Sequence, residues 1–159
     1  MNRAQIKNQR GYSLVEALVA MVLLSIGLLA AGLMQIGSMK ANANAAGRTF
    51  GVGLAQSILD DLRSRPMDDA LLGDTDVDGT AGLDDGIASG GSDPNPANAD
   101  QSMGQITASD GRNYTVFWNV ADDAPVNGAK TLRLFVYWDD SKFGLNKVVM
   151  TGVVGGLYL

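Results

Sequence analysis

The sequence predicts an α+β fold in which one long N-terminal helix packs on a small antiparallel sheet. Three observations lead to this prediction. An uncharged apolar run covers residues 17–39, and a helical pattern of apolar residues continues it to Arg65. Three segments near the C-terminal end alternate between apolar and polar residues, as strands do. With 159 residues, the chain is long enough for one modest core.

The composition excludes several classes of protein. The chain has 12 Lys and Arg, 17 Asp and Glu, a net charge of −5, and neither His nor Cys. A Ser-His-Asp triad, a Cys nucleophile, a His or Cys zinc site and a disulfide framework are therefore excluded. An acidic chain with 6% aromatic residues is also a poor electrostatic partner for nucleic acid. We expect neither an enzyme nor a nucleic-acid-binding protein.

The first element is a basic leader followed by a membrane-spanning segment. Arg3, Lys7 and Arg10 precede the apolar run, and the first eleven residues carry no acid. At about 1.5 Å per helical residue, residues 17–39 cover about 34 Å, which is enough to cross a hydrocarbon core of ~30 Å. The basic residues predict that the N-terminus stays in the cytoplasm.

A plain cleaved signal peptide is the alternative for this segment. Small residues at positions 41–45 fit the A-x-A cleavage pattern. The apolar run is longer than the usual h-region of 7–15 residues. Glu16, the single glutamate of the chain, lies at the head of the run, where a carboxylate costs roughly 2–3 kcal/mol to insert.

The junction between leader and helix has an unusual order of residues, with the sequence RGYSLVE at positions 10–16. Gly11 is flexible, so a protease can reach the peptide bond that follows it. Ser13 and Glu16 fit the S-x-x-E capping box, which satisfies free amides at a helix start. Capping by itself accounts for Glu16 but not for the basic leader and the glycine.

Residues 11–35 (GYSLVEALVAMVLLSIGLLAAGLMQ) resemble the class III prepilin signal of type IV pilins and pseudopilins. Within that superfamily, residues 25–35 and the block NYTVFWNVADDAPVNGAKTLRLFVYWDD at 113–140 are most similar to minor pilins of the PilV kind. The resemblance implies a pilin-like fold. It also implies the function of a minor type IV pilin, which takes part in initiation, assembly or modification of the pilus.

The resemblance further implies how the chain is processed and which partners it has. A prepilin peptidase and methyltransferase would cleave between Gly11 and Tyr12 and methylate the new N-terminus at Tyr12. Glu16 would pair with the amino terminus of a neighbouring subunit, and that pairing agrees with the cost of an unpaired carboxylate in lipid. The other partners implied are minor and major pilins and inner-membrane lipid. A single-pass inner-membrane protein with a periplasmic head, later placed in the pilus or at its tip, is expected.

On this interpretation the chain has three regions. Residues 1–11 are the cleaved leader, and residues 12–39 are the half of the helix that spans the membrane or lies in the filament core. Residues 40–159 form the periplasmic head, which comprises the second half of the helix at 40–65, an acidic loop at 66–111 and the sheet at 112–159.

The second half of the helix is amphipathic, and Pro66 ends it. Apolar residues recur on one face at helical spacing. They are Phe50, Leu54, Ile58 and Leu62, with Ala55 and Leu59 at the edge of the same face.

The acidic loop contains a calcium-like spacing of carboxylates. Asp74, Asp76, Asp78 and Asp85 form the pattern D-x-D-x-D-G-x5-D, close to that of an EF-hand loop. The sequence leaves two interpretations open, a bound Ca²⁺ or a solvated loop in which Asp and Gly simply favour turns. We expect that the protein requires no cofactor, although Ca²⁺ is a candidate ligand of the loop at 74–85. Residues 91–104 are expected to be disordered or loosely held.

Three strands are expected in the sheet, at residues 114–120, 131–138 and 148–154, with residues 157–159 as an extension of the third. Turn-rich segments at 122–128 and 139–144 predict antiparallel order. Trp118 and Trp138 are expected to be core residues that pack against the amphipathic helix.

Two rivals to the minor-pilin hypothesis remain open. The first is a minor pseudopilin of a type II secretion system, which would have the same anchor in a different machine. The second is a membrane-anchored periplasmic calcium-binding module that does not polymerise. That module would keep its leader and would not need Glu16.

Overall fold

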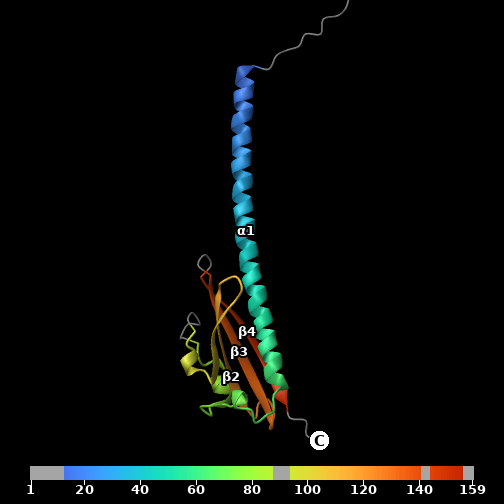
Figure 1. Ribbon diagram of the computed structural model, residues 1–159, viewed down its shortest axis with the longest axis vertical. Coiled ribbons are helices and arrows are strands. Elements are labelled where there is room, and N and C mark those ends of the chain that lie inside the picture. The colour runs from blue at the N-terminus through green and yellow to red at the C-terminus, as the bar shows by residue number, and fades with distance from the viewer. Residues whose placement is uncertain (1–12, 88–93, 141–143, 156–159) are drawn as a thin grey trace, which may run out of the picture. The chain divides into compact units, whose positions relative to one another are not determined.

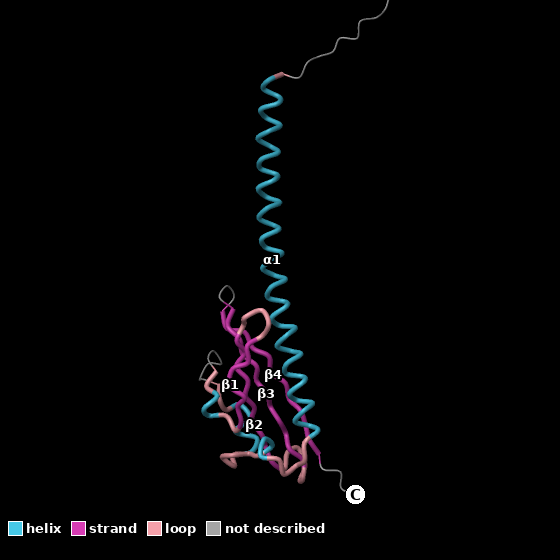
Figure 2. Tube along the Cα trace, viewed as in Figure 1, coloured by secondary structure: helices cyan, strands magenta, loops and turns pink. Residues whose placement is uncertain are grey.

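A computed structural model describes residues 13–87, 94–140 and 144–155 of the chain. The chain divides into two compact units, Met1–Ala43 and Asn44–Leu159, and each is described by itself. The second unit is called the head below. Helix α1, Leu14–Ser64, belongs to both units. It is labelled in Figures 1 and 2, where Figure 1 colours it by residue number from blue to green. The predicted helix is confirmed, and it ends just before Pro66; Tyr12, where it was expected to begin, lies outside the described residues.

Four strands form one antiparallel sheet in the described part of the head, in the order β1-β2-β3-β4. The strands are β1 Gln101–Thr107, β2 Asn113–Asp122, β3 Ala129–Asp140 and β4 Gly144–Gly155. The last three strands correspond to the three predicted from alternation, and the α+β fold is confirmed. The predicted extension at 157–159 lies outside the described residues.

Strand β1 lies within the segment that was expected to be a loop. Its sequence, QSMGQIT, has few apolar residues, and it is exposed along most of its length because it is an edge strand. Its pairing with β2 is also irregular between Ser102 and Gly104, where Gly104 has a φ of 73°. An exposed, irregular edge strand carries no apolar alternation, so the sequence pattern missed it.

Three short 3-10 turns also lie in the described part of the acidic segment: η1 Ala70–Leu72, η2 Gly79–Asp84 and η3 Pro96–Asn98. Figure 2 shows helical turns of this segment on the side of the sheet away from α1. η1 is not among them, because its Leu72 lies in the core cluster that α1 shares with the sheet. Residues 91–104 were expected to be disordered or loosely held. Residues 94–104 instead include η3 and the start of β1, and residues 91–93 lie outside the described part of the chain. Pairing with β2 from Gln101 on and the packing of Ala99 on the aromatic cluster hold a stretch that has few large apolar residues of its own.

The main core lies between the later turns of α1 and one face of the sheet. Trp118 and Trp138 are buried there, as predicted, together with Tyr114. The indole N–H of Trp118 donates a hydrogen bond to the carbonyl oxygen of Leu71, at 2.9 Å. The helix contributes four buried apolar side chains of the predicted face, Ala55, Ile58, Leu59 and Leu62.

Glycines take the place of apolar side chains one and two turns earlier on this face of α1. Gly47 and Gly51 are buried, and an added Cβ at Gly51 would lie 2.9 Å from the ring of Trp138. Phe50, which the pattern placed in the core, is 39% exposed and packs against the ring of Tyr114 at 4.8 Å between centroids. The bulk of Trp138 explains the glycine at position 51, because a side chain there would prevent the close approach of helix and ring. At Gly47 an added Cβ would meet the guanidinium of Arg112 first.

A second, smaller cluster lies on the opposite face of the sheet. Phe117, Phe135 and Tyr137 are buried there, and Phe117 stacks on the other two rings at 5.1 and 5.8 Å between centroids. Ile87 and Ala99 of the acidic segment cover them. The acidic segment therefore covers part of the sheet, and β2 and β3 are buried on both faces.

Candidate functional site

The first candidate site is the start of α1. Gly11 and Tyr12 lie outside the described residues. Glu16 lies in the first turn of the helix and is exposed, and the amide of Ala17 donates a hydrogen bond to the carbonyl oxygen of Ser13 at 3.2 Å. An acidic side chain in the first turn is favoured by the helix dipole, because free N–H groups give that end a partial positive charge.

Between residues 17 and 39, the surface of α1 carries no charge and is mostly apolar on every side. All the Leu, Val, Ile and Met side chains between residues 14 and 39 are exposed. Among the described residues, α1 is the one helix long and apolar enough to cross a membrane by length and composition. A helix that is apolar all round needs lipid or other helices around it. These features are compatible with a membrane-anchored protein.

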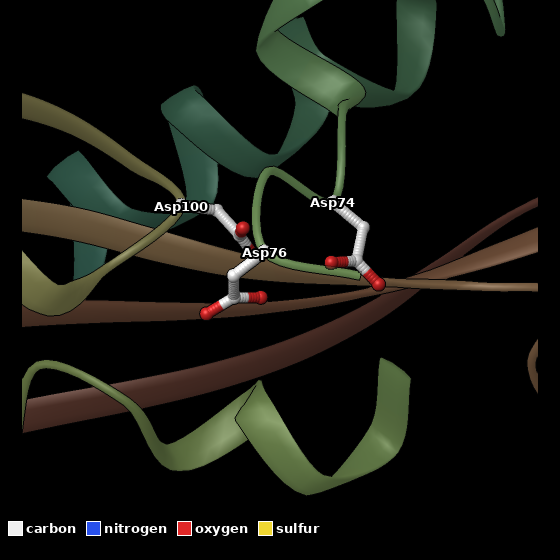
Figure 3. A group of neighbouring side chains, drawn as sticks. All are labelled: Asp74, Asp76 and Asp100. Carbon is white, nitrogen blue, oxygen red and sulfur yellow. The ribbon is translucent and has the colours of Figure 1, made fainter. Parts of the chain in front are cut away.

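The second candidate site is the acidic loop, and the structure arranges the predicted ligands in two groups. Asp76, Asp78 and Asp85 have carboxylate oxygens within 4.8 Å of one another. Asp74 lies instead in a group with Asp76 and Asp100, which Figure 3 shows. Three of the four predicted residues thus meet in one place, and Asp76 belongs to both groups.

Asp74 has a local role in shaping the loop. Its Oδ1 accepts a hydrogen bond from the amide of Val77 at 2.7 Å, and its Oδ2 accepts one from the amide of Gly79 at 3.1 Å. Val77 and Gly79 both have left-handed φ values, of 60° and 63°. Asp74 therefore stabilises a tight turn with left-handed backbone conformations, which non-glycine residues such as Val77 rarely adopt.

Asp100 was not predicted from the sequence, although it joins the loop to the sheet. Its Oδ1 accepts hydrogen bonds from the amide and hydroxyl of Thr75, at 2.6 and 2.7 Å, and its Oδ2 accepts one from the amide of Val120 at 2.8 Å. The buried Asn119 accepts from the Asp100 amide and donates to the carbonyl oxygen of Asp85, at 3.1 and 2.8 Å. The linear spacing of an EF-hand loop ends at Asp85, so it gave no signal for Asp100.

The carboxylates of the loop have the chemistry that Ca²⁺ prefers, namely several hard oxygen donors. Asp76 and Asp78 are exposed and Asp85 is half-buried, so water can complete a coordination shell. Asp78 also lies against the backbone of buried Gly82, where an added Cβ would overlap its carboxylate. The residues present therefore fit a divalent cation by donor type.

Just before this loop, Asp69 joins η1 to the end of α1. Its Oδ1 accepts a hydrogen bond from the amide of Leu71 at 2.9 Å, and its Oδ2 forms an ion pair with Arg65 at 3.0 Å. The Leu71 amide and then the Arg65 guanidinium hold the pKa of Asp69 below its usual value. Arg65 also pairs with Asp61 at 2.8 Å, and the two carboxylates raise its pKa. This network fixes the chain where it leaves the helix.

Comparison with known proteins supports the interpretation of the first site. The family model described as the prokaryotic N-terminal methylation motif matches residues 6–32. No curated protein and no solved structure gives a significant match. With the confirmed α+β fold, the motif supports a type IV pilin-like or pseudopilin protein. The motif implies processing by a prepilin peptidase and association with other pilins in general.

Proposed function

We propose that the chain is a minor type IV pilin of the PilV kind, a structural subunit that takes part in initiation, assembly or modification of the pilus. The observation that carries the proposal is the methylation motif at residues 6–32 on a helix whose Leu, Val, Ile and Met side chains between residues 14 and 39 are all exposed. The similarity of residues 25–35 and 113–140 to PilV minor pilins supports the finer assignment. On this proposal the chain acts by assembling and carries no catalytic site.

In this proposal Gly11 and Tyr12 are the processing site. A prepilin peptidase cleaves between them and the new amino terminus of Tyr12 is methylated. The head then lies in the periplasm, with the leader in the cytoplasm before cleavage and α1 in the inner membrane. The Arg3, Lys7 and Arg10 side chains support this orientation, because basic residues stay on the cytoplasmic side.

Glu16 is proposed to guide assembly by pairing with the amino terminus of a neighbouring subunit. Its exposure in the first turn of α1 supports the proposal, because an exposed carboxylate on a lipid-facing helix lacks solvation until a cation approaches. In the filament, a partner ammonium group offsets that cost and sets the register between helices. The adjacent apolar surface favours association of the helices but does not by itself set the register between them.

Mass spectrometry of the membrane-extracted protein tests the processing step. We expect an N-terminus at methylated Tyr12 in cells with the peptidase, and the unprocessed chain in cells without it or with Gly11→Val. Glu16→Gln should be processed normally but incorporated poorly into pili, whereas Ser13→Ala, a change three residues away, should be incorporated. An N-terminus near Ala45, or an intact Met1 in the presence of the peptidase, would contradict the proposal.

The pseudopilin alternative predicts a different consequence of deletion. Loss of the gene would then reduce secretion of folded proteins and leave pili intact. A minor pilin predicts the reverse, a loss or change of surface pili with normal secretion. Both are measured on the same deletion strain, by electron microscopy of pili and by assay of secreted enzymes.

Calcium binding by the acidic loop stays a prediction. The proximity of Asp76, Asp78 and Asp85 supports it, because three carboxylates within 4.8 Å repel one another until a cation joins them. A calcium-binding module without assembly remains the rival from a different class. It predicts that Glu16→Gln has no effect on the location of the protein.

A further inference from the structure

One face of β4 is uncovered in the described part of the head. The register places Lys147 opposite Tyr137 and Val149 opposite Phe135, on the face of the sheet away from α1. Leu145 and Val153 lie on the same face because side chains alternate along a strand. Leu145, Val149 and Val153 are 41%, 38% and 47% exposed. These three residues and Lys147 are called the β4 strip below.

The neighbouring strand shows what kind of segment covers this face. On this face, Phe135 of β3 belongs to the buried aromatic cluster against which Ile87 of the acidic segment packs. Next to Phe135, Arg133 forms an ion pair with Asp84 of η2 at 3.0 Å. The cover therefore combines an apolar side chain on the aromatic residue with a carboxylate on the cation. The β4 strip has the matching features, Val149 and Lys147, with no cover among residues 13–87, 94–140 and 144–155.

The acidic loop carries the complementary pair of features on its surface. Val77 is 86% exposed, and the carboxylates of Asp76 and Asp78 flank it in the chain. The turn held by Asp74 keeps Val77 at a φ of 60°, which a β-branched residue rarely adopts. The loop thus carries an exposed apolar side chain and, at the two adjacent positions, exposed carboxylates whose oxygens lie within 4.8 Å of each other.

We propose that the part of the acidic loop around Val77, residues 76–78, docks in one copy on the β4 strip of a second copy. Val77 packs against Val149, and the Asp76 or Asp78 carboxylate pairs with Lys147. The two surfaces differ, so after the contact forms the first copy still has a free β4 strip and the second copy still has a free loop around Val77. Such heterologous contacts propagate from subunit to subunit instead of closing into a dimer.

The contact is small, and this limits where it can form. A stable interface in solution buries about 800 Å² on each partner, far more than a few side chains provide. Subunits held together in one membrane or filament have a high effective concentration, at which a weak contact is populated. The proposal therefore rests on the proposed assembly of the chain with other pilins, and the contact would align heads that α1 has already brought together.

The lack of cysteine makes a cross-linking test specific. Full chains carrying Val77→Cys and Val149→Cys, with different tags, are expressed together, and membranes are treated with a short bismaleimide. EDTA is added so that no divalent cation occupies Asp76 and Asp78. We expect an adduct that contains both tags. The matched control pairs Val77→Cys with Val126→Cys, an equally simple change at an exposed valine in the turn between β2 and β3, and should give little adduct.

Charge reversal supplies the second measurement. Lys147→Glu added to the Val149→Cys chain should lower the yield about fivefold, the effect expected of an exposed ion pair. Asp76→Lys added to the Val77→Cys chain should restore it. Equal yields with Val149→Cys and Val126→Cys, or cross-linking of the strip to another protein instead, would overturn the proposal. The N-terminus of the same samples is measured, so a methylated Tyr12 without adduct rejects the contact and leaves the pilin proposal intact.

Discussion

The hydroxyl of Tyr114 on β2 donates a hydrogen bond to the carbonyl oxygen of Gly47 on α1, at 3.2 Å, in the buried interface between helix and sheet. It is a polar contact in a core that is otherwise mostly apolar. A tyrosine hydroxyl is protonated at neutral pH, and burial raises the pKa of Tyr114 further above its usual value. The hydrogen bond therefore helps to set where α1 lies against β2, and it contributes to the stability of the interface between them.

Tyr114→Phe is expected to lower the free energy of unfolding by about 1 kcal/mol, the usual net value of one hydrogen bond. Tyr137→Phe is the matched control on the other face of the sheet. The Tyr137 hydroxyl is buried without a hydrogen-bond partner in the described structure, so its removal should leave stability unchanged or slightly raised. Urea unfolding of the full chain in detergent, followed by the fluorescence of buried Trp118 and Trp138, measures both. Equal losses in the two variants would contradict the assignment.

Alanine at Gly51 and at Gly53 should have opposite effects. Alanine stabilises an exposed helix position by up to about 1 kcal/mol relative to glycine, and Gly53 is exposed with open space around it. At Gly51 the new Cβ would press on the ring of Trp138 at 2.9 Å, and overpacking costs about 1–3 kcal/mol. Thermal unfolding by circular dichroism should show a higher midpoint for Gly53→Ala and a lower one for Gly51→Ala. A rise in both would mean that the ring moves aside freely.

The Asp69 carboxylate should stabilise the head at neutral pH and lose this stabilising effect in acid. Its pKa is lowered in the folded state, so it contributes stability above the unfolded pKa of about 4, and this contribution is lost as the pH falls through the folded value. Asp69→Asn should therefore reduce the difference in urea midpoint between pH 7 and pH 3. Asp68→Asn, which removes the same charge from the exposed neighbouring residue, should leave that difference nearly unchanged. An identical profile for both variants would reject the role of Asp69.

Calcium binding is checked by calorimetric titration of the full chain in detergent. Asp76 belongs to both carboxylate groups, so Asp76→Ala should abolish the heat of binding. Asp68→Ala should preserve it, because Asp68 belongs to neither group. Asp100→Asn should weaken binding if Asp100 positions the loop through Thr75. No heat with the unaltered chain would reduce the segment to a solvated loop.

Local patterns predicted the elements that have strong periodicity of their own. Strands β2 and β3 alternate clearly, and the helix has an apolar run and then an amphipathic face, so their limits were close to those observed. Strand β1 could not be found in this way, because an exposed edge strand needs no apolar face. The burial of Phe117 and Tyr137 also depends on a distant segment, and alternation cannot show which segment covers a second face.

The candidate sites divide along the same line. The sequence alone predicted the junction around Gly11, Tyr12 and Glu16, because a motif of this kind is recognised by the order of neighbouring residues. Gly11 and Tyr12 lie outside the described residues, so the processing site stays a prediction. Only the tertiary structure separated Asp74 from Asp78 and Asp85 and brought Asp100 to the loop, through hydrogen bonds that join residues far apart in the chain. The exposure of Val77 and of one face of β4 could likewise be learned only from the tertiary structure, since exposure depends on how all other segments pack.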